Sequence, residues 1–299
     1  MARIKNKIGV SRGDKVFYFV SGMIVFFLTA LVLYPLIYVV SASFSSAQAV
    51  SSGRMWLWPV DTTLVGYNYI LQYRSVWIGY RNTIFYSLAA TLVGVVITML
   101  CAFPLSRKHL RGRRFFTFIF TFTMIFSGGM IPSYLLMKNI GFINTPWAMI
   151  IPGSMSVYNM IVARTFIQTT IPDELIDASR IDGCSDFMFF FKILLPLSIT
   201  IIAVLSMTYI AGHWNAYFNA FLYLNDKELF PLQIFLRQIL IQNNFETDML
   251  DADAVDQMQT LAMLLKYSVI VVSTAPMLIL FPFFHKYFQK GVMIGSVKG

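Results

Sequence analysis

Charged side chains are scarce in this sequence. Asp, Glu, Lys and Arg make up 12% of its 299 residues, whereas they make up about 25% of a typical soluble domain. Hydrophobic residues make up 57%, and the mean hydropathy is +0.67. This composition excludes an ordinary soluble globular domain and predicts an integral membrane protein.

Residue types that carry catalytic or metal chemistry are also few. The chain has two cysteines and three histidines, and their spacing matches no metal-ligand pattern. Neither a phosphate-binding G-x-x-x-x-G-K-[ST] loop nor a nucleophile elbow occurs in the sequence. We therefore expect no catalytic residue, no metal site and no cofactor bound by this chain.

Apolar runs of membrane-spanning length are present instead. A helix that crosses the hydrocarbon core needs about 20 residues. The first run is too long to be a removed signal peptide and lacks a small-residue cleavage site. We expect an all-α membrane protein with six transmembrane helices in residues 16–284, between an N-terminal segment (1–15) and a C-terminal tail (285–299). The six runs are Val16–Val40, Thr83–Phe103, Phe115–Met137, Trp147–Phe166, Pro196–Tyr217 and Leu261–Phe284.

Lys and Arg are distributed unevenly between the predicted loops. If the N-terminus is cytosolic, sixteen of the 23 basic residues lie on the cytosolic side and seven lie outside. Positive residues concentrate in cytosolic loops, so we expect both termini to be cytosolic. The net charge of +9 is then a topology signal. Nucleic-acid binding is a poor alternative, because no basic face stands clear of the membrane.

None of the six apolar runs contains Asp or Glu. Transporters driven by protons or sodium usually carry carboxylates or broken helices at mid-membrane depth. The lack of carboxylates counts against that kind of transport. The energy for transport would then have to come from a partner.

A mostly polar segment, residues 171–197, separates the fourth and fifth runs on the predicted cytosolic side. Pro172 suits the first turn of a helix, and Gly183 suits a helix stop. We expect one helix to end near Ile181 and a second to begin near Ser185. The second helix would present an apolar surface of Phe187, Phe190, Phe191 and Leu194. A simpler alternative is that both helices lie on the membrane surface and only connect spans.

The polar segment resembles the coupling loop of ABC-importer permeases. Residues 177–183 are D-A-S-R-I-D-G, and L-L-P-L follows at a fixed interval, with Pro196 opening the next span. The family pattern is roughly E-A-A-x-x-D-G, then a helix and I-x-L-P, so Asp177 replaces Glu and Ser179 replaces the second Ala. The resemblance implies docking on an ATPase through Glu174, Asp177, Ala178, Ser179, Asp182, Gly183, Phe187 and Pro196.

The resemblance covers nearly the whole chain. Residues 126–152 are similar to carbohydrate-importer permeases, and the final G-S-V-K-G resembles the tail of the maltose-type second permease. The most similar subgroup handles oligosaccharides and uronic-acid polymers and includes the alginate importer. Membership implies a bacterial inner-membrane protein with four kinds of partner: the lipid bilayer, a second homologous permease, two ATPase subunits that bind ATP and Mg²⁺, and an extracytoplasmic binding protein. A permease for another solute class, such as peptides, and a non-transporting membrane anchor are the alternatives.

Hydrogen-bonding residues gather at the predicted outer end of the fifth run. Trp214 lies in the sequence G-H-W-N-A-Y-F-N, next to Asn215 and close to Tyr217. An indole face can pack on a pyranose ring while neighbouring polar groups bind its hydroxyls. These three residues are therefore candidates for the substrate path. The alternative is that Trp214 belongs to the aromatic belt of the membrane interface.

Overall fold

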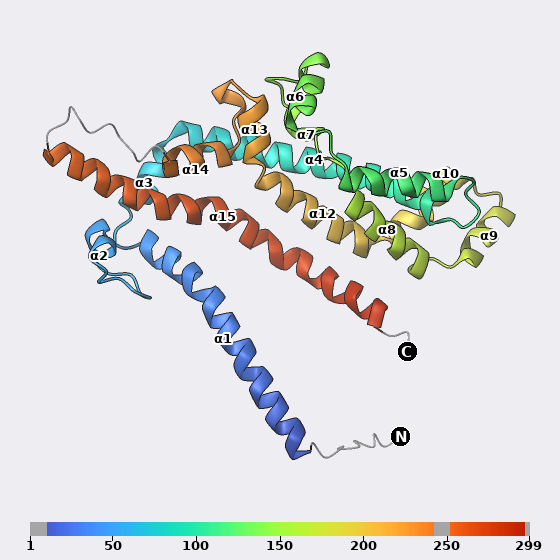
Figure 1. Cartoon of the computed structure of the whole chain (residues 1–299), viewed down its shortest axis with the longest axis horizontal. Helices are drawn as coiled ribbons and strands as arrows, with labels where there is room; N and C mark the ends of the chain where they lie inside the picture. Colours follow the sequence, from blue (N-terminus) through green and yellow to red (C-terminus); the bar gives the residue numbers. More distant parts are fainter. Residues whose placement is uncertain (1–10, 242–251, 297–299) are drawn as a thin grey trace. The chain divides into compact units, whose positions relative to one another are not determined.

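The computed structural model describes residues 11–241 and 252–296, and all regular structure in these ranges is helical (Figure 1). The chain divides into two compact units, residues 1–70 with 243–271 and residues 71–242 with 272–299. One element, η1, is a π-helix and another, η2, is a 3₁₀-helix. In chain order the elements are α1 (Arg12–Ser43), α2 (Ala47–Ser51), α3 (Val65–Gln72), α4 (Arg74–Ser106), α5 (Arg113–Ile125), α6 (Met130–Asn139), α7 (Trp147–Ile150), α8 (Val157–Thr170), α9 (Asp173–Ile181), α10 (Asp186–Phe189), η1 (Phe190–Leu194), α11 (Leu195–Leu197), α12 (Ile199–Trp214), α13 (Tyr217–Tyr223), η2 (Lys227–Leu229), α14 (Leu232–Ile241) and α15 (Ala252–Ser296).

Helix α1 of the first unit is apolar along most of its length. Its first turn is closed by Asp14, whose carboxylate accepts a hydrogen bond from the Ser11 N–H at 3.0 Å. In its most apolar 18-residue window, 0% of the residues are buried within the chain. Burial begins only at the C-terminal end, at Ser41, Ala42 and Ser43. The apolar surface of α1 is therefore suited to contact lipid.

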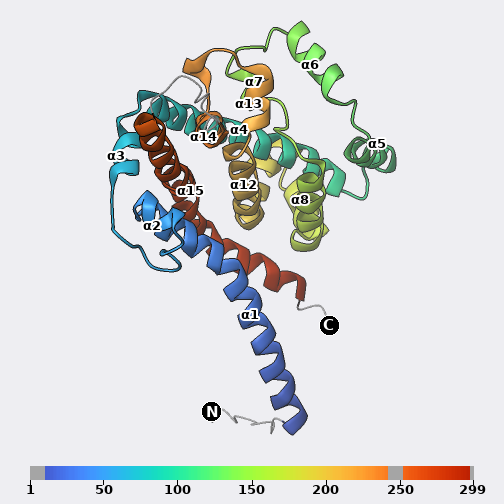
Figure 2. The same cartoon turned by 60° about the vertical axis from the view of Figure 1, so that its left-hand side comes forward.

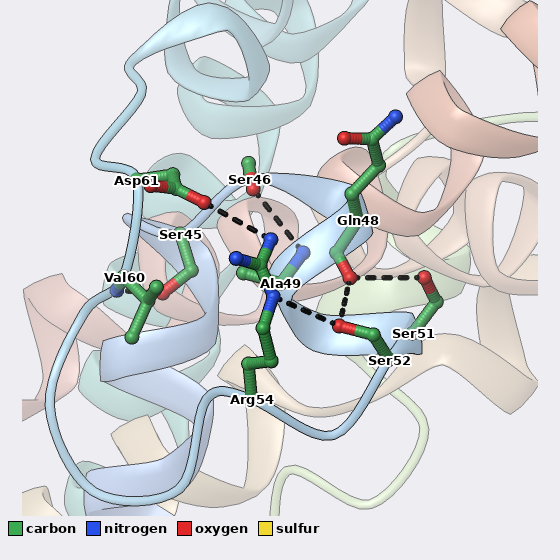
Figure 3. Close-up of polar contacts among 9 residues, drawn as sticks. All are labelled: Ser45, Ser46, Gln48, Ala49, Ser51, Ser52, Arg54, Val60 and Asp61. Carbon is green, nitrogen blue, oxygen red and sulfur yellow. Dashed lines mark hydrogen bonds and ion pairs between the residues drawn. The ribbon is translucent and has the colours of Figure 1, made fainter.

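The segment after α1 folds back on itself around α2 (Figure 3). The Ser46 N–H donates to the Val60 carbonyl at 3.2 Å, and the Val60 N–H donates to the Ser45 hydroxyl at 3.1 Å. Ser45 is fully buried, whereas Arg54 and Asp61 form an exposed ion pair at 3.2 Å. Several polar groups of the loop are thus paired within the loop itself.

Helix α4 is the centre of the second unit, where it packs against α8, α12 and α14 (Figure 1). Its buried face includes the small residues Gly94 and Ala102, which allow neighbouring backbones to approach closely. The Tyr209 hydroxyl of α12 shares a 2.6 Å hydrogen bond with the Thr98 hydroxyl and accepts one from the Ser156 N–H at 3.1 Å. One side chain therefore joins α12 to α4 and to the start of α8.

Three helices of the structure match predicted membrane spans in length and composition. Helices α1 and α4, and residues 262–284 of α15, are each long and apolar enough to cross a membrane. They correspond to the first, second and sixth predicted spans. The described residues contain three such helices, or up to five spans if each of two bent helix pairs counts as one.

The third predicted span, Phe115–Met137, is not a continuous helix. Helices α5 and α6 share it and meet at an angle of 110° (Figure 2). Between them Gly129 has a φ of 86°, which interrupts a right-handed helix and which glycine adopts without strain. The fifth predicted span, Pro196–Tyr217, is likewise interrupted at Ser198, where the chain bends by 80° before α12. Hydropathy does not report such turns, because it carries no information on φ.

The fourth predicted span, Trp147–Phe166, is also wrong as a single helix. Residues 151–156 separate α7 from α8, and Gly153 within this interval has a φ of 73°. The preceding Pro152 has no backbone N–H, so a helix passing through it would lose a hydrogen bond. The apolar run is real, but its backbone turns in the middle.

Gly94→Ala should destabilise the protein. A Cβ at Gly94 would overlap the carbonyl oxygen of Ser154, a backbone atom that cannot swing aside. We expect this overpacking to cost about 1–3 kcal/mol, measured as a lower unfolding temperature in detergent. Gly212→Ala in α12 is the matched control, because a Cβ there meets nothing within 4 Å. Alanine should stabilise that helix by about 0.5–1 kcal/mol, and equal effects of both changes would contradict the close packing at Gly94.

Candidate functional site

The polar segment begins with the helix expected for it. Helix α9 starts after Pro172 and carries Asp173 and Glu174 in its first turn, where acidic groups favour the positive helix end. Gly183 has a φ of 75°, and its N–H donates to the Arg180 carbonyl at 3.0 Å. The predicted start and stop of this helix are both confirmed.

One face of α9 is exposed and the other packs inward. The exposed motif residues are Glu174, Asp177, Ala178, Asp182 and Gly183. Ile176 and Ser179 are each only 6% exposed, and the Ser179 hydroxyl donates to the Ile176 carbonyl at 2.7 Å. Ser179 therefore faces the interior of its own chain, because the helix turns it away from the exposed face. The available surface of the motif consists of carboxylates, an alanine and a glycine.

The second helix of the polar segment exposes less apolar surface than expected. Helix α10 begins after Ser185 and passes directly into the π-helix η1. Phe187 and Phe191 are 71% and 48% exposed, but Phe190 and Leu194 are 4% and 0% exposed. The expectation of one apolar surface is thus half wrong, since Phe190 and Leu194, at the two ends of η1, pack in the core. The buried half anchors the segment, and the exposed half remains available for contact.

Pro196 does not open the next span. It lies exposed in α11, which continues directly from η1. Helix α12 starts only after the bend at Ser198. Proline lacks the N–H that a helix interior needs but is tolerated in a first turn, which fits this short helix. Pro196 therefore belongs to the end of the polar segment.

A partly buried arginine connects the polar segment to α4. Arg107, just beyond the end of α4, forms an ion pair with Asp173 at 3.6 Å, and its guanidinium carbon lies 4.9 Å from the Phe103 ring centroid. The side chain of Arg107 is 16% exposed, whereas that of Lys108, 3.3 Å from the same carboxylate, is 76% exposed. Phe103 also stacks on Phe189 of α10. The end of α4 therefore contacts both helices of the segment.

The guanidinium of Arg107 is partly withdrawn from water. Burial lowers the pKa of its guanidinium, and the Asp173 carboxylate opposes that change. Two of its donors, Nε and Nη2, are buried with no hydrogen-bond partner among the described residues. Unpaired buried donors cost free energy, so stability alone does not account for this arginine. Arg107 instead joins two elements, because it lies just beyond the end of α4 and pairs with Asp173 in the first turn of α9.

The three candidate substrate residues lie together at the end of α12. Trp214 is 4% exposed, and its indole N–H donates to the Ser273 carbonyl at 3.1 Å. With Asn215 and residues of α15 between 273 and 281, it lines an apolar cavity of about 270 Å³. Tyr217 is 39% exposed beside this site. Trp214 is therefore part of the wall of this cavity.

Sequence reasoning did not single out two arginines with well-defined surroundings, Arg107 and Arg237. The distribution of basic residues along the sequence indicates topology but not individual contacts. Phe103 and Arg107 are four residues apart at a helix end, a spacing that places ring and guanidinium on one face. That spacing was a usable signal. Arg237 contacts the rings of Tyr217 and Phe221 in another helix, and no local pattern predicts a contact over that separation.

Comparison with known proteins identifies the family. Residues 94–294 match the family model described as the binding-protein-dependent transport system inner membrane component. The chain belongs to this family. It is 40% identical over 268 residues to the polygalacturonan/rhamnogalacturonan transport system permease protein YtcP of Bacillus subtilis, covering 89% of this chain and 92% of the relative. It is 36% identical over 270 residues to the protein LplC of the same species, covering 90% of each.

A solved structure agrees with this assignment. A chain of a bacterial ABC transporter involved in the import of the acidic polysaccharide alginate superposes with a TM-score of 0.84 at 32% identity. The match covers 93% of this chain and 98% of that one. The present chain is thus an ABC-importer permease of the inner membrane, a transport subunit and not an enzyme. Such permeases work in general with another permease, an ATPase and a binding protein.

Arg107→Met should loosen α9 without unfolding the permease. Met keeps the packing of the apolar stem and removes the unpaired donors, so we expect the free energy of unfolding to stay within about 1 kcal/mol of wild type. Loss of the ion pair with the half-exposed Asp173 should cost α9 about 1 kcal/mol locally. That corresponds to roughly fivefold faster amide exchange in α9, measured by hydrogen–deuterium exchange. Lys108→Met removes the more exposed, solvent-screened partner of the same carboxylate and should accelerate exchange clearly less. Equal acceleration by both variants would refute the role of Arg107.

Proposed function

We propose that this permease imports an oligosaccharide or polysaccharide in partnership with a second, homologous permease. Two ATPase subunits bind ATP and Mg²⁺, and an extracytoplasmic binding protein delivers the solute. The carbohydrate assignment is supported by relatives whose names include polygalacturonan, rhamnogalacturonan and alginate. The chain crosses the membrane six times with both termini in the cytosol, an arrangement supported by the sixteen-to-seven division of its basic residues.

The polar segment 171–197 is the proposed contact with the ATPase. The observation that carries this proposal is the exposed acidic face of α9, which ends in the left-handed turn at Gly183. Asp177 and Asp182 supply charge on that face, and Phe187, 71% exposed, supplies an apolar contact. Charged and aromatic groups of this kind are suited to a specific protein interface.

The anchorage of the segment gives it a means to move the membrane helices. Arg107 ties α9 to the end of α4, and Phe190 and Leu194 fix η1 in the core. A force on the exposed face is therefore passed to α4, which packs against α8, α12 and α14. ATP binding closes the ATPases, draws the segment inward and tilts these helices so that the cavity opens outward.

The function is tested by ATP hydrolysis of the complete transporter in lipid nanodiscs. A binding protein loaded with oligogalacturonate should stimulate hydrolysis severalfold over the unloaded protein. A peptide offered at the same concentration should not. Stimulation by the peptide alone would show that the permease serves another solute class.

Accessibility to a membrane-impermeant maleimide tests the orientation. In a variant whose two native cysteines are replaced by serine, a cysteine at Ser52 should be labelled from outside intact cells. A cysteine at Arg111 should be labelled only after the membrane is opened. Both positions are exposed, so protection cannot be attributed to burial. Labelling of the Arg111 position from outside would reverse the topology and remove the polar segment from reach of an ATPase.

Gly183→Val and Asp177→Lys should separate membrane insertion from energy coupling. A β-branched residue is strained by about 1–2 kcal/mol at the positive φ of Gly183, and Lys reverses the charge at the proposed contact. Both variants should reach the membrane at normal levels, lose co-purifying ATPase and lose at least 90% of uptake. Gly183→Asn is the control, because Asn tolerates that φ, and it should retain more coupling than Val. Wild-type uptake and ATPase binding in both variants would show that the segment is only a connecting loop.

A further inference from the structure

Helices α13 and α14 bring together side chains that neither the polar segment nor the fold explains. The guanidinium carbon of Arg237 in α14 lies 5.5 Å from the ring centroid of Tyr217 and 4.6 Å from that of Phe221, both in α13. Gln233, one turn before Arg237, donates to the side-chain carbonyl of Asn215 at 3.4 Å. Two helices thus meet through a cation, two aromatic rings and two amides.

This group of side chains is built on a fixed scaffold. Helix α14 is anchored to α4, where the Leu232 N–H donates to the Thr83 hydroxyl at 2.9 Å. Just before α14, the Asn82 amide donates to the Glu228 carbonyl at 2.7 Å. Leu232 is 1% exposed, so the anchored face of α14 is part of the core. Binding groups held on packed helices keep their geometry better than groups on loops.

Arg237 is partly buried and yet has no ion pair. The statement covers the carboxylates whose side chains the structure describes, in residues 11–239 and 262–284. Charges withdrawn from water are normally paired. Its contacts with Tyr217 and Phe221 are cation–π contacts, which use none of its N–H donors as hydrogen-bond donors, so those donors stay available. Their fork matches the two oxygens of a carboxylate.

We infer that Arg237 binds the carboxylate of a uronic acid unit in the transported saccharide. Asn215 and Gln233 lie beside it as partners for the hydroxyl groups of the sugar ring. Asn215 also lines the cavity next to Trp214, so a chain held at Arg237 adjoins that cavity. This inference rests on the proposed carbohydrate function and narrows it to acidic saccharides.

The test compares two trisaccharides that differ only in their carboxyl groups. Trigalacturonate and its carboxyl-reduced form, galactotriose, are titrated by equilibrium binding against the complete transporter in nanodiscs. No binding protein is added, because it would impose its own selectivity. Wild type should bind trigalacturonate at least tenfold more tightly than galactotriose. Arg237→Gln should remove about tenfold of the affinity for trigalacturonate and leave galactotriose binding unchanged.

Two further variants separate recognition from simple charge or folding effects. Arg237→Lys keeps the charge but loses the fork, so it should retain part of the preference for the acid. Arg54→Gln, the control, removes an outer arginine that is already paired with Asp61 and should change neither affinity. Equal losses for both sugars in Arg237→Gln, or no loss for either, would overturn the inference while leaving carbohydrate transport intact. If wild type bound neither trisaccharide, the inference would fail, and the hydrolysis assay with loaded binding protein would still decide the proposed function independently.

Discussion

The hydroxyl group of Tyr209 lies where three parts of the second unit meet, and it has no access to water that could replace its partners. It bonds the Thr98 hydroxyl at 2.6 Å and the Ser156 N–H at 3.1 Å. In an apolar interior, leaving such donors and acceptors unpaired costs free energy. The two bonds therefore fix the start of α8 against α4 and α12. Gln168, near the end of α8, repeats the connection by donating to the Ser106 carbonyl at 3.1 Å. The direction in which the chain enters α9 follows from these two attachments.

The polar segment is held by two kinds of interaction that differ in size and in effect. Phe189, Phe190 and Leu194 are 1%, 4% and 0% exposed. Burial of each stabilises the segment by about 1.5–3 kcal/mol. The ion pair between Arg107 and the half-exposed Asp173 contributes at most about 1 kcal/mol. Apolar burial therefore keeps the segment on the protein. The ion pair joins the first turn of α9 to Arg107, the residue just beyond the end of α4.

The parts of the fold that could be predicted are those where one local signal has one structural outcome. A proline, two acids and a glycine define α9 because capping acts over a few residues. Long apolar runs identify α1 and α4 because lipid imposes a length. The breaks in the third and fourth predicted spans follow from backbone torsions at Gly129 and Gly153, to which hydropathy is blind. Burial of Ser179 and the stacking of Arg237 depend on which helices become neighbours, and tertiary packing alone decides that.

The contrast between α1 and α4 has a consequence for how the two helices diverge among related permeases. Lipid chains are fluid and fit any apolar side chain, so the bare surface of α1 places no demand on the shape of individual residues. Exchange among Leu, Ile, Val and Phe is then nearly neutral there, while insertion or deletion changes the fit to the bilayer thickness. Helix α4 has the opposite constraint, because a methyl group at Gly94 already collides with a neighbouring backbone. We therefore expect α1 to tolerate exchange of one apolar residue for another but not a change in length, and the buried face of α4 to tolerate little exchange at all.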